Sequence, residues 1–229
     1  MLDISNRKVV PLMINVGIGR DFVNSKDYIL DLLACQCMPT LLKWKPASLI
    51  TVDKRRICDM HEFDTILRYY LDQYLCSLMV FQETESRLYL FLYNEHLLWL
   101  SMSMGMRQSF LERYGYGIDK NQLGASISQL GNKYRTYWVS GEFPHEIGIF
   151  MGYPLADVEG FIRNHGKNYV LCGMWKVYER VKVAEAAFSA FHQIKSRAIA
   201  LVETKGELLY RCEIEAQDYS QIGWELLSY

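Results

Sequence analysis

The sequence predicts one α+β domain over residues 1–229, in which several helices pack on a largely antiparallel or mixed central sheet. Half of the residues are hydrophobic and 14% are aromatic, which is enough to fill one sizeable core. No stretch rich in Ser, Gly or Pro marks a linker between two domains. Helical and strand patterns also follow one another without the strict alternation of a doubly wound fold.

In the first third of the chain, apolar side chains at helical spacing predict a helix over 26–36, which Pro39 must soon end. The short, partly β-branched segment 47–52 predicts a strand. Between 61 and 75 the apolar residues recur every three or four positions, which is typical of an amphipathic helix. This part therefore supplies two helices and one strand.

The middle of the chain predicts a β-hairpin and two helices. Aliphatic and aromatic residues at 78–82 and 87–93 flank a short polar turn, as hairpin strands do. Helices are expected over 95–113 and 119–138, where Gly115 and Gly117 separate them and Asp119 is placed to cap the second.

In the last third of the chain, prolines and glycines mark where the predicted helices begin and end. A short helix is expected to start at Pro144 and end near Gly152, and Pro154 is expected to begin another helix, which Gly166 stops. Residues 169–178 predict a strand. A long helix over 181–203 and a final strand over 207–215 complete the chain.

Composition excludes some classes of partner. The 25 basic and 26 acidic residues give a net charge of −1, so the chain lacks the positive excess that nucleic acid requires. The longest apolar window, 88–106, has Asn94, Glu95 and His96 at its middle, which favours a strand and a helix over a membrane span. Six scattered cysteines without a CxxC pair and the lack of a secretory signal predict a cytoplasmic protein with reduced thiols.

Two short motifs resemble those of a bacterial family called domain of unknown function 3793, which carries Pro-His-Glu and Leu-Gly-Tyr-Pro. In this chain they are Pro144-His145-Glu146 and Met151-Gly152-Tyr153-Pro154. Met151 replaces the usual Leu with a residue of similar volume. Segments 37–45 and 166–178 are similar to two further blocks of the family, so the resemblance covers about 32–178, and 181–229 matches less clearly. The resemblance implies no activity, substrate or cofactor.

Three residues are candidates for catalysis. His145 and Glu146 lie in the first turn of a predicted helix, where they can act as general acid and base, or can simply cap the helix. A zinc protease site would need a second His where the chain has Ile149, and we predict no metal site. Cys37 is a candidate nucleophile for pairing with His145, although a thiol at the end of a helix is not activated by the helix dipole and can equally be a buried structural residue.

The predicted ligand-binding residues come from three blocks that ordinary amphipathic segments separate, which is typical of loops that build one site. They are Thr40, Lys45, Tyr153, His165, Asn168, Trp175 and Lys176. A stacking wall for a planar ligand can form from five aromatic residues together with Lys176, with core packing as the alternative: Trp175, Tyr178, Trp138, Tyr137 and Tyr153.

Our main hypothesis is a cytoplasmic bacterial protein with a small-molecule or cofactor pocket around the Pro-His-Glu motif, where His145 and Glu146 face the 37–45 loop and the strand of Trp175. The alternative is a non-enzymatic module, in which the motifs only fix turns and exposed aromatic side chains contact a partner protein such as a small redox carrier. The sequence identifies neither a cofactor nor a reaction.

Overall fold

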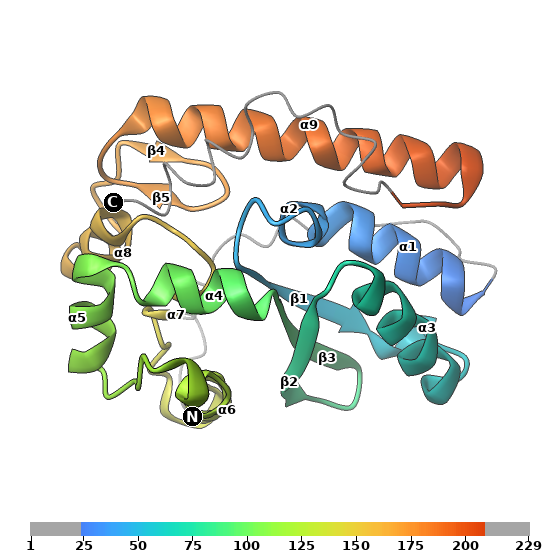
Figure 1. Ribbon diagram of the computed structural model, residues 1–229, viewed down its shortest axis with the longest axis horizontal. Helices are drawn as coiled ribbons and strands as arrows, with labels where there is room; N and C mark the ends of the chain where they lie inside the picture. The colour runs from blue at the N-terminus through green and yellow to red at the C-terminus, as the bar shows by residue number, and fades with distance from the viewer. Residues whose placement is uncertain (1–23, 209–229) are drawn as a thin grey trace, which may run out of the picture.

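The computed structural model describes residues 24–208, and in this part helices surround a three-stranded antiparallel sheet of order β1-β3-β2 (Figure 1). The strands are β1 (Ala47–Asp53), β2 (Ser77–Glu83) and β3 (Arg87–Tyr93). Ile50 and Val80 both lie opposite Leu90 of the central strand. The predicted α+β class and the β2–β3 hairpin are confirmed.

The central strand β3 is buried on both faces. Leu88, Leu90 and Leu92 belong to one hydrophobic core, whereas Tyr89, Phe91 and Tyr93 belong to the other. Because successive side chains of a strand point to opposite faces, this run can be apolar throughout only when both faces of the sheet are covered. The sheet therefore separates two cores.

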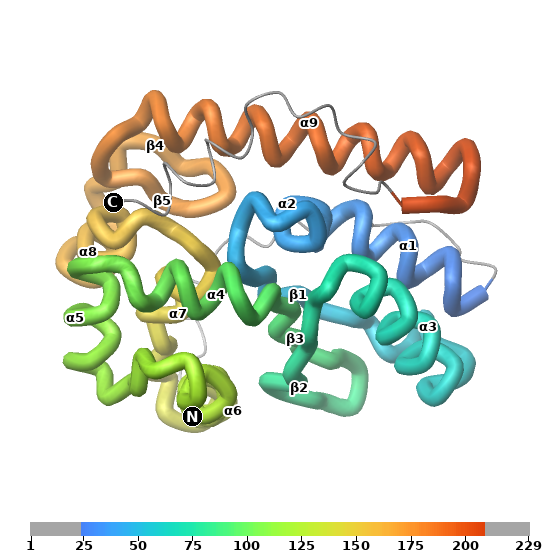
Figure 2. Tube along the Cα trace, in the orientation of Figure 1, coloured from blue at the N-terminus to red at the C-terminus, as the bar shows by residue number. Residues whose placement is uncertain are grey.

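The first core lies between the sheet and a layer of four helices. These are α1 (Ser25–Gln36), α2 (Met38–Leu41), α3 (Met60–Gln73) and α9 (Val181–Lys205). Asp59 is the N-cap residue of α3, and its carboxylate accepts hydrogen bonds from the backbone N–H groups of His61 and Glu62. Helix α9 runs along α1 and α2 and reaches the far end of the molecule (Figures 1 and 2).

Five further helices of the described part pack on the second core. They are α4 (Glu95–Met102), α5 (Gly105–Arg113), α6 (Leu123–Ser140), α7 (Ile147–Phe150) and α8 (Leu155–Arg163). The prediction of one helix over 95–113 is wrong, because the chain turns between α4 and α5. Gly105 takes a φ of +43° there, and the hydroxyl of Ser103 donates to the carbonyl of Leu100. Asp119 caps a short 3-10 helix, η2 (Lys120–Gln122), that precedes α6.

The single strand predicted for 169–178 is also wrong. The structure has two short strands, β4 (Leu171–Cys172) and β5 (Lys176–Val177), which pair as an antiparallel hairpin. Gly173 lies in its turn against the ring of Phe188, where a Cβ atom would clash, so a side chain cannot be accommodated at this turn without moving the ring. Nearly all of the final strand predicted for 207–215 lies outside the described residues.

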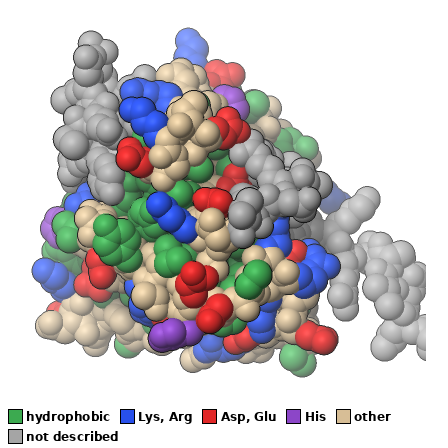
Figure 3. Space-filling model, turned by 90° about the vertical axis from the view of Figure 1, so that its right-hand side faces the viewer, with side chains coloured by type: hydrophobic (Ala, Val, Ile, Leu, Met, Phe, Trp, Pro, Cys, Tyr) green, Lys and Arg blue, Asp and Glu red, His purple; other side chains and the backbone are tan. Residues whose placement is uncertain are grey.

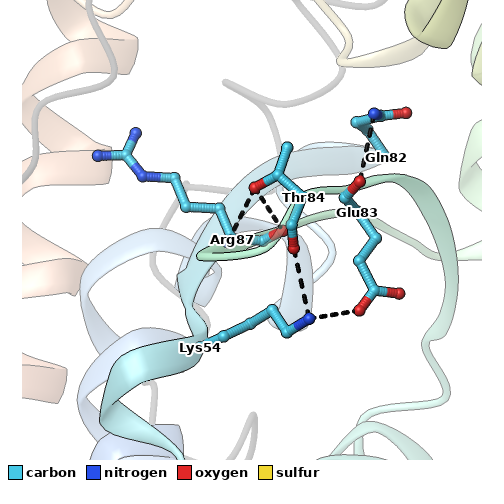
Figure 4. A network of polar contacts seen from close by, with 5 residues as sticks. All are labelled: Lys54, Gln82, Glu83, Thr84 and Arg87. Atoms are coloured by element: carbon cyan, nitrogen blue, oxygen red, sulfur yellow. Dashed lines mark hydrogen bonds and ion pairs between the residues drawn. The ribbon is translucent and has the colours of Figure 1, made fainter.

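A polar network fastens the β2–β3 turn to η1 (Lys54–Arg56), as Figure 4 shows. The Nζ atom of Lys54 donates to Oε1 of Glu83 at 2.6 Å and to the carbonyl of Thr84 at 3.3 Å. Thr84 closes the turn, since its Oγ1 accepts a hydrogen bond of 3.0 Å from the N–H of Arg87. Glu83 is exposed, so we expect this ion pair to fix the geometry of the turn more than it stabilises the fold.

Charges of both signs are mixed on the end of the molecule that includes α3 and the C-terminal end of α9 (Figure 3). Blue and red side chains alternate there around a few hydrophobic ones. Among the described helices, none combines the length and the apolar composition needed to cross a membrane.

Candidate functional site

The two motifs form the start and the end of one short helical segment. After α7, the N–H of Tyr153 donates to the carbonyl of Gly148 at 2.8 Å and the N–H of Gly152 donates to that of Ile149 at 3.0 Å. These are the two bonds of a Schellman cap, which requires a left-handed residue, and Gly152 supplies it with a φ of +82°. Pro154 then caps α8. The Gly-Tyr-Pro motif thus fixes the direction in which Tyr153 leaves α7.

Glu146 lies in a closed polar cluster. Its side chain is only 3% exposed, and its Oε1 accepts hydrogen bonds from Nζ of Lys133 at 2.8 Å and from the hydroxyl of Tyr116 at 3.0 Å. The Lys133 amine also lies 4.5 Å from the centroid of the Tyr116 ring. The carboxylate is therefore charge-compensated by α6 and by the segment before it, and does not face solvent.

His145 is half-buried between two aromatic rings, with centroid distances of 5.4 Å to Phe143 and 5.0 Å to Phe161. Burial lowers the pKa of His145; Glu146 opposes this shift and His165 adds to it. The imidazole is thus favoured in its neutral form at neutral pH. The acid–base roles predicted for His145 and Glu146 stay predictions.

Cys37 and Thr40 are sealed in the first core. Neither has measurable exposure, and the hydroxyl of Thr40 shares a hydrogen bond of 2.8 Å with that of Ser48. Burial raises the pKa of Cys37 far above its usual range, which disfavours the nucleophilic thiolate. The structure therefore gives both side chains a packing role and does not favour the functions predicted for them.

The other predicted residues of the third block lie around the connection from α8 to the β4–β5 hairpin. His165 and Asn168 are exposed and have φ values of +50° and +57°. Lys176 donates from Nζ to the carbonyl of Gly166 at 2.6 Å, and its amine lies 4.9 Å from the centroid of Tyr169. Lys176 therefore closes the connection that holds His165 and Asn168.

One residue from each of the three blocks meets the others at a second place. The Nζ atom of Lys45 lies 5.6 Å from the centroid of Tyr153, and the ring of Tyr153 stacks on Trp175 at 5.0 Å and 24°. Trp175 in turn contacts Phe188 of α9 edge-on at 4.5 Å. Of the five aromatic residues suggested for the wall, Tyr153 and Trp175 stack on each other, whereas Tyr137 and Trp138 lie together on α6. We call the Tyr153–Trp175 pair the aromatic wall, and Lys45 lies over its Tyr153 ring.

Lys45 lies beside another lysine. Its neighbour Trp44 stacks on Phe191 of α9 at 6.4 Å, which places Lys45 near Lys195, one turn further along α9. Burial lowers the pKa of Lys45 to about 8, and the charge of Lys195 acts in the same direction. In the part of the chain that the structure describes, no carboxylate forms an ion pair with either lysine.

We call Lys45, Tyr153, Trp175 and Lys195 the Lys45 site. Lys45, Tyr153 and Lys195 each keep partial access to solvent, whereas Trp175 is buried. Burial also raises the pKa of the Tyr153 hydroxyl to about 12. The site therefore combines two partly buried lysines with apolar aromatic surface.

Comparison with known proteins identifies the family. Residues 33–210 match the family described as protein of unknown function (DUF3793). The chain belongs to this family. The matched DUF3793 region includes all three blocks that meet at the Lys45 site, and the family assignment made from the motifs is confirmed. No curated protein and no solved structure matches the chain.

Two buried charged residues of this DUF3793 protein orient the aromatic wall. Asp157 accepts a hydrogen bond from Nε1 of Trp175 at 2.7 Å and another from the N–H of Tyr178 at 2.7 Å. Arg107 donates to the carbonyl of Tyr153 at 3.1 Å and to the hydroxyl of Ser101 at 2.7 Å. Asp157 therefore fixes the indole of Trp175, and Arg107 fixes the backbone beneath Tyr153.

Sequence reasoning missed Asp157, Arg107 and Lys195. The only available signal was a carboxylate at position 157, between the buried Leu155 and Val158 of a predicted helix, since a charge on an apolar helix face needs a partner. Arg107 and Lys195 gave no such signal. Among the described residues, no group of three or more His, Cys, Asp or Glu side chains is placed to hold a metal ion.

Proposed function

We propose that this DUF3793 protein binds a small organic anion with a planar unsaturated part at the Lys45 site. The observation that carries the proposal is the contact of Lys45, Tyr153 and Trp175, which come from three separate blocks of the sequence. Ammonium groups bind carboxylates and phosphates, and the faces of aromatic rings stack on planar groups. The two lysines and the wall supply both kinds of contact.

The surroundings of the two amines support binding rather than simple packing. An ammonium group that is largely removed from water costs free energy unless an opposite charge compensates it. This protein compensates Lys133 with Glu146 at 2.8 Å. Lys45 and Lys195 have no such partner among the described residues, and an anionic ligand would supply one.

The proposal moves the site away from the Pro-His-Glu motif. Glu146 joins α7 to α6 through Lys133, and the same short helix ends in the cap that presents Tyr153. We therefore propose that the motif supports the site. We further propose that the protein acts in the bacterial cytoplasm, because Cys35, Cys37, Cys58, Cys76 and Cys172 are all free thiols.

The test is ligand binding by purified protein. We expect aromatic carboxylates or aryl phosphates to raise the melting temperature and to change tryptophan fluorescence. Lys45→Ala should weaken binding about 10- to 100-fold, which corresponds to about 1.5–3 kcal/mol for a hydrogen bond to a charged group. The matched control is Lys120→Ala. Lys120 also lies over an aromatic ring, that of Trp99 at 5.9 Å, but it is exposed and lies outside the Lys45 site.

Equal binding by Lys45→Ala and the wild type would contradict the proposal, as would a wild-type protein that responds to no compound of the series.

The second candidate function is the non-enzymatic interaction module. It is favoured by two large apolar side chains at the end of α6, Trp138 and Val139, which are 46% and 92% exposed. If purified protein binds no small anion but binds a small redox carrier, and Trp138→Ser abolishes that binding, this function replaces the first.

A further inference from the structure

We infer that Lys45 is a nucleophile that captures the carbonyl group of its ligand as an imine. The inference rests on the proposed function, because the ligand must occupy the Lys45 site before it can react. It narrows the ligand class from planar anions to planar anions that carry an aldehyde or ketone.

The geometry leaves the Lys45 amine available. The amine lies over the ring of Tyr153, which stacks on Trp175, and the preceding residue, Trp44, stacks on Phe191. In the described part of the chain it makes no ion pair, whereas Lys54 and Lys133 are each held by a carboxylate. An amine in apolar surroundings and outside an ion pair can use its lone pair in a reaction.

Burial favours the free-base form of the amine by lowering its pKa, and the charge of Lys195 acts in the same direction. Lys195 faces it from α9 with the same sign, and Cys37 faces it from the end of α1. Cys37 would raise the pKa of Lys45 only as a thiolate, and burial keeps that thiol protonated. With its pKa lowered to about 8, Lys45 is about one-tenth unprotonated at pH 7. An exposed lysine, with a pKa near 10.4, is unprotonated in fewer than about one molecule in a thousand.

The reaction needs no oxidant or reductant. The nitrogen lone pair attacks the carbonyl carbon, a C–N bond forms, and the π electrons of the C=O bond move to oxygen, which takes up a proton while nitrogen loses one. The resulting carbinolamine takes up a second proton at its hydroxyl group and releases water as the C=N bond forms. A protonated imine remains. Lys195 would hold the carboxylate or phosphate of the ligand, and Tyr153 would stack on its unsaturated part.

The experiment uses pyridoxal 5′-phosphate, a planar aldehyde with an anionic group, as the probe. Full-length protein is incubated with a small excess of probe, reduced with cyanoborohydride, digested and mapped by mass spectrometry. At pH 7 we expect the Lys45 peptide to be labelled at least about 10-fold faster than the peptide of the exposed Lys120, because burial favours the free base of Lys45 and its aromatic neighbours hold the probe. Labelling of Lys45 should rise with pH through its pKa of about 8 and level off about one pH unit above that value.

Lys45→Arg keeps the positive charge and removes the nucleophile. We expect this variant to bind the probe without forming the adduct, as seen by fluorescence before and mass spectrometry after reduction. If wild-type protein binds the probe but is labelled at Lys195 or at random, the proposal of an imine at Lys45 is wrong, whereas the proposal of a binding site is retained. Wild-type protein that neither binds nor reacts with this probe would overturn the imine, and the broader ligand series then decides the binding proposal separately.

Discussion

At the scale of single residues, Lys133 and Lys45 differ in what surrounds their ammonium groups. Lys133 reaches a buried carboxylate and lies over the Tyr116 ring, so its charge is satisfied within the protein. Lys45 reaches an aromatic face and a second lysine instead. The sequence predicted Lys45 as a ligand-binding residue, but its lowered pKa depends on burial in the folded chain and on Lys195, which is more than a hundred positions away. Sequence spacing carries no information on such neighbours.

Removal of the Glu146 carboxylate tests the structural role that we assign to the Pro-His-Glu motif. Glu146→Ala leaves Lys133 and Tyr116 without their shared acceptor, and we expect a loss of about 2–3 kcal/mol in the free energy of unfolding. The full cost of breaking a buried ion pair is not expected, because Lys133 is one-third exposed and can turn to water. Glu146→Gln keeps the shape and one acceptor, so it should cost less. Urea denaturation measures both.

A different pattern would restore the motif as the functional centre. If Glu146→Ala unfolds at the same urea concentration as the wild type but no longer binds the ligand, the carboxylate acts on the ligand and the Lys45 site is misassigned.

At the scale of elements, residue patterns within a segment correctly predicted the helices and strands that depend on interactions within that segment. The amphipathic helix over 61–75 became α3, and the alternation around a polar turn became the β2–β3 hairpin. One failure occurred where a residue far along the chain determines the local fold. Residues 169–178 have the composition of a strand, yet Phe188 of α9 and the small size of Gly173 let the chain fold back within it. Nothing within that segment reveals the ring against which it turns.

The substitution Gly160→Ala tests which of two effects is larger: the steric clash between α8 and the residue after β5, or the higher helix propensity of alanine. Propensity alone predicts that Gly160→Ala in α8 stabilises the helix by about 1 kcal/mol. A Cβ atom there would lie 2.5 Å from Cγ and 2.8 Å from Cβ of Tyr178, just after β5, and the root of that side chain cannot swing away. We expect the clash to prevail, with a net loss of about 1–3 kcal/mol in thermal or urea denaturation.

The matched control for this prediction is Gly124→Ala in α6, where a Cβ atom meets nothing within 4 Å. There propensity acts alone and should stabilise the protein by about 0.5–1 kcal/mol. A stabilising Gly160→Ala would show that α8 does not pack on the β5 side as closely as described.

At the scale of the molecule, a sheet separates two cores and one side chain contacts both. Tyr153 packs against the core beneath α1, α3 and α9 and also against the core beneath α4 to α8. The sequence suggested Tyr153 and Trp175 as two of five aromatic residues of one wall, and the structure stacks these two on each other. It could not place Arg107 or Asp157 beneath them, since those contacts arise only when the two cores close on each other.

This position makes Tyr153 a test of how the two cores are coupled. Tyr153→Ala removes a ring that contacts both cores and Trp175, and we expect a loss of about 2–4 kcal/mol in the free energy of unfolding. Tyr153→Phe keeps the ring and should change stability little. Tyr69→Ala is the surface control, because Tyr69 is mostly exposed on α3 and should cost under about 0.5 kcal/mol.

Coupling also predicts the form of the unfolding transition. Far-ultraviolet circular dichroism and tryptophan fluorescence should report one coincident urea transition for the wild type, because each core unfolds only when the other does. In Tyr153→Ala the cores share less contact, so the two transitions should separate. Coincident transitions in Tyr153→Ala would mean that the sheet alone couples the cores. The Lys45 site would then depend on Tyr153 for its aromatic face and not for the alignment of the two halves.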